Sequence, residues 1–593
     1  MLLDPERVPV AGQPIAPLAP PRRNAWQGVA WMRAICILFA AGDAWISRYA
    51  LGPDGTAYLD LARAWLRGDW TTAFNSYWSP LYAWLLAGTI SLLPAGSRSE
   101  LFAGHLINFA GFLLALFAGE FLLREWTATA GAPRHPRLVA LAGYLTLAWV
   151  SLHLVGLGFN SADIYVMAEV LFVAAMLVRI RRRAAGSGEF ALLGLALGAG
   201  FLAKAAGAVL IVAALPVAAV LLRSATHKGI RIAAACCALV TLPFVCALSL
   251  AKHRFVYSDA GQVNYKLVVG GNSLEGYKDS IHPPPAGLPH PLRVRHEDPR
   301  VVSFEDHLTG TFPVHADPSW WTEGYPASAA PGRQWTALRS GIIYSLTLAA
   351  QAPALWLLFL AALAGAVRIR RLSLRRVWPV ALVAAAATAP YWLIVVHPRY
   401  IAGPLALTGF LAIAAAWHAA LPRLAQRAAC VAMLLAAAIP MWVELAVVPF
   451  YTIGEPLGIA SPPEKINIEL AETMRREGLR AGDRVAYIGD TLDGTWLALD
   501  GAQIVAMVPA RVYHDESTAE RPIREDFAGP DRYWRSSPAQ RDEVMRAFRE
   551  AGAKWVFADD VPPGADVSGW SVAGSAHRLR GEDSDKQFFR RID

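Results

Sequence analysis

The sequence predicts a polytopic α-helical membrane protein with a small extracytoplasmic α/β domain at its C-terminus. The chain has 593 residues, of which 55% are hydrophobic and 17% charged, and its mean hydropathy is +0.34. An ordinary soluble domain has about 25% charged residues. Apolar runs near the length of about 20 residues that a helix needs to cross a bilayer recur over most of this chain. After residue 450 strand-like and helix-like runs alternate, as in α/β domains.

Eleven apolar segments are long enough, or nearly long enough, to span the membrane. They cover residues 28–50, 101–123, 137–158, 164–180, 190–203, 206–222, 230–250, 341–366, 377–396, 401–420 and 428–449. A shorter apolar segment, 79–94, would place later basic runs on the side opposite to Arg22 and Arg23 if it crossed, against the positive-inside rule. We therefore predict an interfacial or half-inserted helix at 79–94, a membrane domain over 28–450 and a cytoplasmic N-terminal segment over 1–27.

Three substantial segments then lie outside the membrane: 51–100, 251–340 and 451–593. The middle segment is rich in Pro, His and aromatic residues and shows little periodicity, so we predict an irregular loop over the membrane domain. The tail predicts strands and short helices at 484–488, 495–499, 503–508, 538–551 and 555–558. Gly489 and Asp490 follow the first strand, where α/β folds often bind ligands. Because the tail has no glycine-rich phosphate motif, structural support or acceptor docking is favoured over a second active site.

The charge and cysteine patterns argue against nucleic-acid-binding, disulfide-rich and zinc-binding proteins. The net charge is +8, but the basic residues gather in short runs between apolar segments, as membrane orientation requires. Nucleic acid is therefore not a predicted partner. All five cysteines lie within or beside apolar runs, which argues against a disulfide framework or a zinc cluster. The Ala- and Arg-rich composition is typical of bacteria and predicts a multi-pass protein of the inner (plasma) membrane, with a cytoplasmic N-terminus and a periplasmic or extracellular C-terminal domain.

Acidic residues stand where predicted spans leave the membrane on the outer side. Asp54 lies four residues before Tyr58, which places both on one face of a helix. A carboxylate there can act as a general base toward an acceptor hydroxyl or amine, or can hold a divalent cation. Asp163 begins the span 164–180 and is either a helix N-terminal acid or a second acid of the site. Asp43 is a further acidic candidate, because an unpaired acid inside a span costs about 3 kcal/mol on insertion scales.

Cationic residues are predicted on the same side of the membrane. Lys204 lies between two short apolar runs, where it can either meet a lipid phosphate or snorkel at a tight turn. His397, Arg399 and Tyr400 lie together in another outer loop. The planar fork of Arg399 suits a phosphate, and His397 can add a further donor. An outer acid with Lys204 and Arg399 supplies a base for an acceptor and cations for a leaving phosphate, as transfer from a lipid phosphate requires.

These residues lie in motifs that resemble those of the membrane glycosyltransferases of superfamily C, which include protein O-mannosyltransferases and lipid A aminoarabinose transferases. The similar stretches occur in the order of that family, and they are DGTAY at 54–58, WSPLYAWLL at 78–86, AD at 162–163, GLALGAGFLAK at 194–204 and PRY at 398–400. The resemblance implies the helical fold of that superfamily, a polyprenyl-phosphate sugar donor reached from the bilayer, and inversion at the sugar carbon. It implies Asp54 as the catalytic base, and we predict Tyr58, Trp78 and Tyr82 as substrate-positioning residues.

The chain departs from the family at one position of the first motif. The family often has a pair of acids there, whereas Gly55 stands in the second place here. Whether Asp43, Asp163 or no residue supplies a second carboxylate is open at this point. A divalent metal ion is open as well, and its ligands would be Asp54 and Asp163. No other cofactor is predicted.

Two other classes fit part of the pattern. A transporter or flippase of lipid-linked sugars also has many spans with scattered charges, but a carrier needs a midplane site open in turn to both sides. The candidate charges here collect on one predicted face. A noncatalytic assembly subunit is disfavoured by the retained Asp54, Lys204 and Arg399. We therefore predict a glycosyltransferase that moves a sugar from a polyprenyl-phosphate donor to an unidentified lipid, glycan or protein acceptor outside the cytoplasm.

Overall fold

The structure is a computed structural model in which part of the chain is described. The described residues are 29–182, 186–222, 228–270, 292–304, 310–321, 330–365, 374–462, 464–491, 493–509, 529–559, 561–575 and 586–593. The predicted cytoplasmic segment 1–27 lies outside the described residues.

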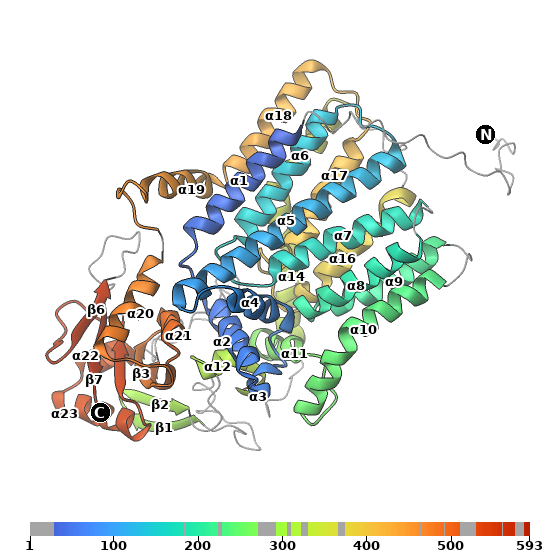
Figure 1. Ribbon diagram of the computed structural model, residues 1–593. Coiled ribbons are helices and arrows are strands. Elements are labelled where there is room, and N and C mark those ends of the chain that lie inside the picture. The colour runs from blue at the N-terminus through green and yellow to red at the C-terminus, as the bar shows by residue number, and fades with distance from the viewer. Residues whose placement is uncertain are drawn as a thin grey trace, which may run out of the picture.

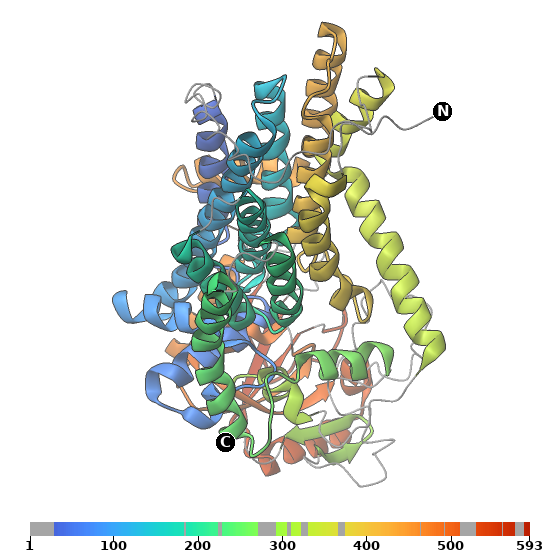
Figure 2. The ribbon, with the colours of Figure 1, turned by 90° about the vertical axis from the view of Figure 1, so that its right-hand side faces the viewer.

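Apolar helices pack side by side into a bundle, and an α/β domain lies at one end of it (Figures 1 and 2). The helices of the bundle are α1 (Ala30–Ile46), α5 (Ser97–Ala130), α6 (Pro136–Ala148), α7 (Asp163–Arg181), α8 (Ser187–Ala203), α9 (Gly207–Leu222), α10 (Lys228–Ala251), α14 (Pro331–Gln351), α15 (Pro353–Leu363), α16 (Leu374–Trp392), α17 (Ala402–Ala416) and α18 (Arg423–Ala438). Among the described residues, three helices are long and apolar enough to cross a membrane, or up to five if each of two bent pairs forms one span. The fold is thus that of a polytopic helical membrane protein, and the count of eleven spans stays a prediction.

Two predicted single spans are broken in the structure. The segment predicted at 341–366 is wrong in its bounds, because α14 starts before it and meets α15 at a bend of 74°. The segment predicted at 428–449 divides into α18 and α19 (Trp442–Gly454), which meet at 68°. Pro353 and Pro440 stand at the two breaks. A proline inside a helix removes a hydrogen bond and clashes with the preceding turn, which accounts for both bends.

A group of short helices lies at the end of the bundle nearest the α/β domain, where Figure 1 shows α2, α4 and α12 beside that domain. The group contains α2 (Pro53–Arg67), α3 (Trp70–Ala73), α4 (Pro80–Leu92), α11 (Ala260–Asn264), α12 (Pro313–Ala316) and α13 (Pro318–Trp321). The segment predicted as an interfacial helix, 79–94, forms α4, which packs on both α2 and α5. Its position relative to the membrane surface stays a prediction.

A seven-stranded sheet in the order β1-β2-β4-β3-β5-β7-β6 is the centre of the α/β domain. Its strands are β1 (Leu292–Glu297), β2 (Arg300–Phe304), β3 (Arg484–Gly489), β4 (Gln503–Pro509), β5 (Trp555–Ala558), β6 (Ser571–Ser575) and β7 (Lys586–Arg591). The central strand β3 is parallel to β4 and β5, and the other pairs are antiparallel. The helices of the domain are α20 (Lys465–Glu477), α21 (Leu497–Asp500), α22 (Gly529–Arg535) and α23 (Pro538–Glu550). The strands predicted in the tail all form.

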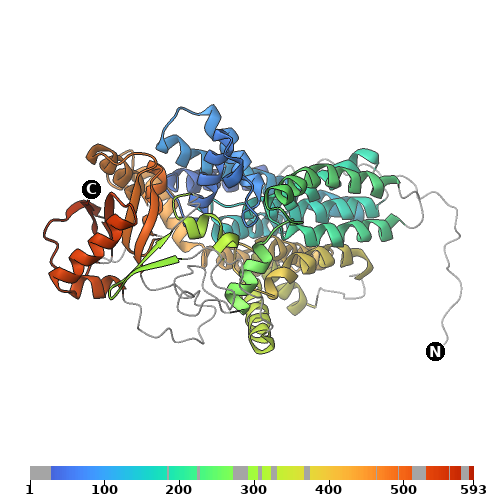
Figure 3. The same ribbon diagram turned by 90° about the horizontal axis from the view of Figure 1, so that it is seen from below.

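Two strands of this sheet come from the middle segment, which corrects the prediction of an irregular loop there. The hairpin of β1 and β2 lies at the edge of the C-terminal sheet (Figure 3). Val302 and Ser303 pair with Met507 and Ala506 of β4. The α/β domain therefore includes residues 292–304 in addition to the C-terminal tail. Local periodicity does not reveal such strands, because their pairing partners lie far along the chain.

Polar contacts fix the α/β domain on the membrane domain. Arg63 of α2 forms an ion pair with Glu100 of α5, with 2.6 Å between Nη2 and Oε2, and also donates a hydrogen bond to the carbonyl of Ala498. The hydroxyl of Ser97 donates to the carbonyl of Leu499 at 2.9 Å and accepts from Arg475 at 2.9 Å. Because α2 touches both domains, any group at its N-terminus is held at their junction.

The close packing of α8 on α10 predicts a large effect at Gly194. A Cβ added there would lie 2.1 Å from the carbonyl oxygen of Ala233, a backbone atom of α10. Gly194→Ala is therefore expected to lower the free energy of unfolding by about 1–3 kcal/mol. Gly188, at the start of the same helix, has nothing within 4 Å of an added Cβ, so Gly188→Ala is the matched control. Thermal unfolding of both variants in detergent tests this, and equal midpoints would contradict the helix contact.

Candidate active site

The candidate catalytic acid stands at the start of α2, at the end of the bundle that faces the α/β domain. Pro53 occupies the first helical position, which suits its fixed φ and missing N–H. Asp54 follows in the first turn, where the helix dipole favours a negative charge. Gly55 comes next, and a Cβ there would lie 2.9 Å from Cβ of Asn160. The side chain of Asn160 therefore occupies the space that a second acid at this position would need.

Four charged side chains from distant parts of the chain, all among the candidates from the sequence, meet here. Nη2 of Arg399 lies 2.7 Å from Oδ2 of Asp54, and Nε of Arg399 lies 3.5 Å from Oδ2 of Asp163. The ammonium of Lys204 pairs with the other oxygen of Asp163. Asp163 is the first residue of α7, Lys204 follows the last residue of α8, and Arg399 lies in the turn between α16 and α17. At rest the two acids and the two cations balance in charge.

Burial divides this ion-pair cluster, Asp54, Asp163, Lys204 and Arg399, into two halves. The side chains of Asp163 and Arg399 are 2% and 11% exposed, whereas those of Asp54 and Lys204 are 25% and 29% exposed. Asp163 and Arg399 thus form the buried floor of the site, and Asp54 and Lys204 form its solvent-exposed side. Buried charges are retained when they are paired and hydrogen-bonded. Asp163 meets this condition, because the hydroxyl of Ser161 also donates to it at 3.0 Å.

The guanidinium of Arg399 keeps a donor for a further ligand. Its Nη1 has no hydrogen-bond partner among the described residues, and its Nε has only the long contact of 3.5 Å with Asp163. Burial lowers the pKa of Arg399, but the charges of Asp54 and Asp163 raise it by more. The pKa of Arg399 therefore lies above its ordinary value. The guanidinium is thus always charged, and the site presents a buried cation with a donor available to an anion.

The ring of Tyr400 packs against the charged groups of both Lys204 and Arg399. The ammonium of Lys204 is 3.9 Å and the guanidinium carbon of Arg399 is 5.1 Å from the centre of its ring. Burial raises the pKa of Tyr400 to about 12, so its hydroxyl stays protonated at neutral pH. The rings of His397 and Tyr391 lie on the same tyrosine, each with 5.3 Å between ring centres. His397 is therefore beside the site, and Tyr391 of α16 is a neighbour that the sequence analysis missed.

His315 of α12 is the second residue that the sequence analysis missed. Its Nε2 lies 3.8 Å from Oδ1 of Asp54. Burial lowers the pKa of His315 and Arg399 adds to this, while Asp54 acts in the opposite direction. The imidazole is therefore neutral at pH 7. The only sequence signal is the richness in histidine of the segment 251–340, because no motif joins His315 to Asp54.

The predicted substrate-positioning aromatics form a cluster behind Asp54. The ring centre of Tyr58 lies 5.2 Å from that of Trp78 and 4.8 Å from that of Tyr82, and all three residues are buried. The hydroxyl of Tyr82 donates to Asn108 of α5 at 2.8 Å. The cluster therefore holds α2 against α4 and α5, which fixes the direction of Asp54. Direct contact of these rings with a substrate stays a prediction.

The additional acidic candidate Asp43 has different partners. Its carboxylate accepts a hydrogen bond from the backbone N–H of Leu157 at 3.1 Å. The ion pairs of Arg399 involve Asp54 and Asp163. Among the acidic candidates, the structure thus brings Asp163 into the site beside Asp54 and gives Asp43 a role in holding the loop after α6.

The residues present do not fit a divalent metal ion held between Asp54 and Asp163. Arg399 contacts both carboxylates and takes the place that a bridging cation would need, and Lys204 contacts the remaining oxygen of Asp163. In the part of the chain that the structure describes, no group of three or more His, Cys, Asp or Glu residues is arranged to hold a metal. The positive charge of this site comes from its own side chains.

Fold and site together define a class of protein: a polytopic helical membrane protein with acids and cations at the end of its bundle that faces an α/β domain. No family model and no curated protein matches the chain. Solved structures are similar at low identity. The apo oligosaccharyltransferase of Archaeoglobus fulgidus is 15% identical over 90% of this chain and 70% of that chain, with a TM-score of 0.45.

A second similar structure is ArnT from Cupriavidus metallidurans bound to undecaprenyl phosphate. It is 15% identical over 95% of this chain and 98% of that chain, with a TM-score of 0.41.

Proposed function

We propose that the protein is a glycosyltransferase that moves a sugar from a polyprenyl-phosphate donor to an acceptor outside the cytoplasm. The observation that supports the proposal is the buried donor Nη1 of Arg399, which has no hydrogen-bond partner among the described residues and lies on a guanidinium already held by Asp54 and Asp163. Leaving a buried donor unpaired costs about 1–3 kcal/mol. A phosphate offers several acceptor oxygens to such a fork, and Lys204 on the open side adds a second cation.

In the proposed reaction each charged group has one role. The acceptor hydroxyl gives its proton to Asp54 while its oxygen forms a bond to the anomeric carbon of the donor sugar. The bond from that carbon to the phosphate oxygen breaks, and its electron pair leaves with the lipid phosphate. Arg399 and Lys204 stabilise the charge that develops on the departing phosphate. Attack opposite to the leaving group inverts the sugar carbon.

The ion pair between Arg399 and Asp54 keeps the base occupied until the sugar donor binds. With Asp54 bound to the guanidinium, the base is engaged. An arriving phosphate brings further negative charge and competes for the same cation, which releases Asp54 toward the acceptor. The base is thereby freed when the donor is in place.

A turnover assay with purified protein in detergent tests the proposal. We expect the full chain to bind undecaprenyl phosphate and to release or transfer the sugar from at least one of a panel of radiolabelled polyprenyl-phosphate sugars. Binding of such a donor without release of its sugar under any acceptor condition would instead support a flippase, the alternative function. Failure to bind any polyprenyl phosphate would contradict both functions.

Metal removal is expected to leave the transfer rate unchanged, because Arg399 and Lys204 supply the positive charge at the phosphate. The measurement compares the rate after incubation with EDTA and dialysis with the rate of protein taken through the same steps without EDTA. A loss that Mg²⁺ or Mn²⁺ restores would show that a metal ion acts where the guanidinium lies.

A further inference from the structure

Two segments of the membrane domain lead to the two acids of the ion-pair cluster. The segment 47–52 leads into α2 and to Asp54, and the loop 156–162 leads into α7 and to Asp163. Both acids contact the same guanidinium, that of Arg399. The position of one segment relative to the other therefore sets where the two carboxylates stand, and one buried side chain joins the segments.

This side chain is Asn160, which is 5% exposed. Its Nδ2 donates to the carbonyl of Ala50 in the first segment at 3.2 Å. Its Oδ1 accepts from Nδ2 of Asn108 of α5 at 3.3 Å and lies 3.5 Å from the hydroxyl of Tyr82. Both polar atoms of the amide thus have partners among the described residues, as a buried amide requires.

Helix α5 holds the same two segments through two further buried side chains. Nδ2 of Asn108 donates to the carbonyls of Leu157 and Phe159 at 2.9 and 2.8 Å. The ring nitrogens of His105 each lie 3.1 Å from a carbonyl oxygen, Nδ1 from that of Leu157 and Nε2 from that of Ala50. The segment before α2 and the loop before α7 are therefore fixed on one helix of the bundle.

Two glycines leave the space that the amide of Asn160 fills. A Cβ at Gly55, the residue after Asp54, would lie 2.9 Å from Cβ of Asn160. A Cβ at Gly104 of α5 would lie 2.7 Å from its Oδ1, and the atoms nearest to that Cβ all belong to Asn160. The side chain therefore packs between α5 and the first turn of α2, and a shift of the amide shifts the turn that carries Asp54.

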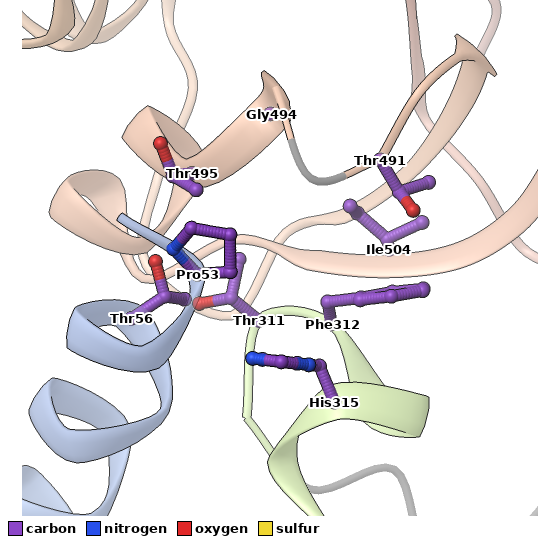
Figure 4. Close-up of a pocket in the computed structure, with 9 residues that line it drawn as sticks. All are labelled: Pro53, Thr56, Thr311, Phe312, His315, Thr491, Gly494, Thr495 and Ile504. Carbon is purple, nitrogen blue, oxygen red and sulfur yellow. The ribbon is translucent and has the colours of Figure 1, made fainter. Parts of the chain in front are cut away.

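The first turn of α2 also borders the α/β domain. Pro53 and Thr56 of this turn line a small cavity together with His315 of α12 and Thr495 of the α/β domain (Figure 4). The turn thus has neighbours in both domains, and Asn160 is its neighbour in the membrane domain.

The loop 156–162 contacts the floor of the site as well. The guanidinium carbon of Arg399 lies 5.4 Å from the ring centre of Phe159, and the hydroxyl of Ser161 donates to Asp163 at 3.0 Å. Asn160 stands between these two loop residues in the chain. It therefore ties the floor of the site to the turn that carries the base.

We propose that Asn160 is a positioning residue for sugar transfer, which keeps Asp54 and Asp163 in register around Arg399. The proposal rests on the proposed function and adds a residue that acts without touching the substrate. When the lipid phosphate draws the guanidinium away from Asp54, the turn stays in place and only the carboxylate changes its partner. The acid then remains at the distance that proton transfer from the acceptor hydroxyl needs.

The test measures turnover, binding of undecaprenyl phosphate and thermal unfolding of the full chain in detergent. Asn160→Ala removes the amide, while the carbonyl of Ala50 keeps its contact with His105. We expect kcat to fall about 10–10²-fold, because a misplacement of about 1 Å can cost this much. Since Arg399 and Lys204 come from other segments, KM for the sugar donor and the affinity for undecaprenyl phosphate should stay within about twofold of the wild type.

Gly104→Ala displaces the same amide while it keeps every polar group of the network. It is expected to lower kcat in the otherwise wild-type chain. It should have no further effect on kcat in Asn160→Ala, where the atoms that the new Cβ would meet are absent. A side chain that contributes only to stability would not give this non-additive change in kcat. If Asn160→Ala did not fold, Gly104→Ala alone would test the displacement.

Gln587→Ala is the matched control, because Gln587 is a buried amide in the α/β domain. It accepts from the indole N–H of Trp496 at 3.2 Å and donates to the hydroxyl of Tyr487 at 3.4 Å. We expect this variant to lower the midpoint of thermal unfolding, as Asn160→Ala does, and to keep the kcat of the wild type.

Two results would overturn the positioning role: a wild-type kcat in folded Asn160→Ala, or a loss in the double variant equal to the product of the two single losses. The proposed function fails separately. A wild type that transfers no sugar would overturn the transferase and the positioning role together, whereas a wild type that transfers sugar no faster than Asn160→Ala would overturn the positioning role alone.

Discussion

Asp54→Asn is expected to lower the rate of sugar transfer by about 10²–10⁴-fold, the contribution of a positioned general base. The amide has nearly the shape of the carboxylate and can still accept a hydrogen bond from Arg399, but it cannot take the acceptor proton. The unpartnered donor Nη1 of Arg399 and the contact of Nε with Asp163 are unaffected. Binding of undecaprenyl phosphate should therefore persist in this variant while turnover is lost, and both are measured on the same purified protein.

Asp69→Asn is the matched control for this experiment. Asp69 caps α3 in the same outer segment, where its side chain accepts from the N–H of Thr72 at 3.3 Å. Asparagine caps helices about as well as aspartate, so this variant should keep wild-type transfer and stability. If Asp54→Asn transferred sugar at the wild-type rate in a folded protein, Asp54 would not be the base, and Asp163 would be the next acid to examine.

A common face for Asp54, Asp163, Lys204 and Arg399 could be predicted because membrane topology restricts where the ends of helices can lie, whereas the choice of Asp163 over Asp43 as the neighbour of Asp54 could not. Each residue stands at the end of an apolar segment, and the alternation of spans puts those ends on one face. The sequence therefore places these four side chains on a common face without any knowledge of their contacts. It also marks them as chemically suited to a phosphate and a base.

Other features depend on contacts that local sequence does not encode. The strands β1 and β2 pair with residues far along the chain, so the periodicity of 292–304 alone did not reveal them. His315 approaches Asp54 because Asp60 holds the preceding turn, and no spacing in the sequence signals that approach. The reason for Gly55 is likewise tertiary, since the side chain of Asn160 occupies the space beside it.

Arg399→Gln is expected to weaken binding of undecaprenyl phosphate by about 10²–10³-fold, because truncating one partner of a buried charge pair costs about 2–5 kcal/mol. It also leaves Asp54 and Asp163 facing each other with Lys204 as the remaining cation. Breaking a buried pair in this way is strongly destabilising, by about 3–5 kcal/mol. The measurements are equilibrium binding of undecaprenyl phosphate and thermal unfolding of the same detergent-purified sample. Arg98→Gln is the control, since its pair with Glu472 is exposed and such pairs contribute about 0–1 kcal/mol.

Two further variants separate the stability effect of Arg399 from its effect on the phosphate. Asp54→Asn combined with Arg399→Gln replaces the ion pair by two neutral amides, so stability should return while phosphate binding stays weak. Arg399→Lys keeps the charge but loses the planar fork, and should fold well and bind undecaprenyl phosphate with intermediate affinity. If Arg399→Gln bound the lipid phosphate as tightly as the wild type, the phosphate would lie on Lys204 alone. The unpartnered donor of Arg399 would then serve another ligand, and the base would not be released by the donor.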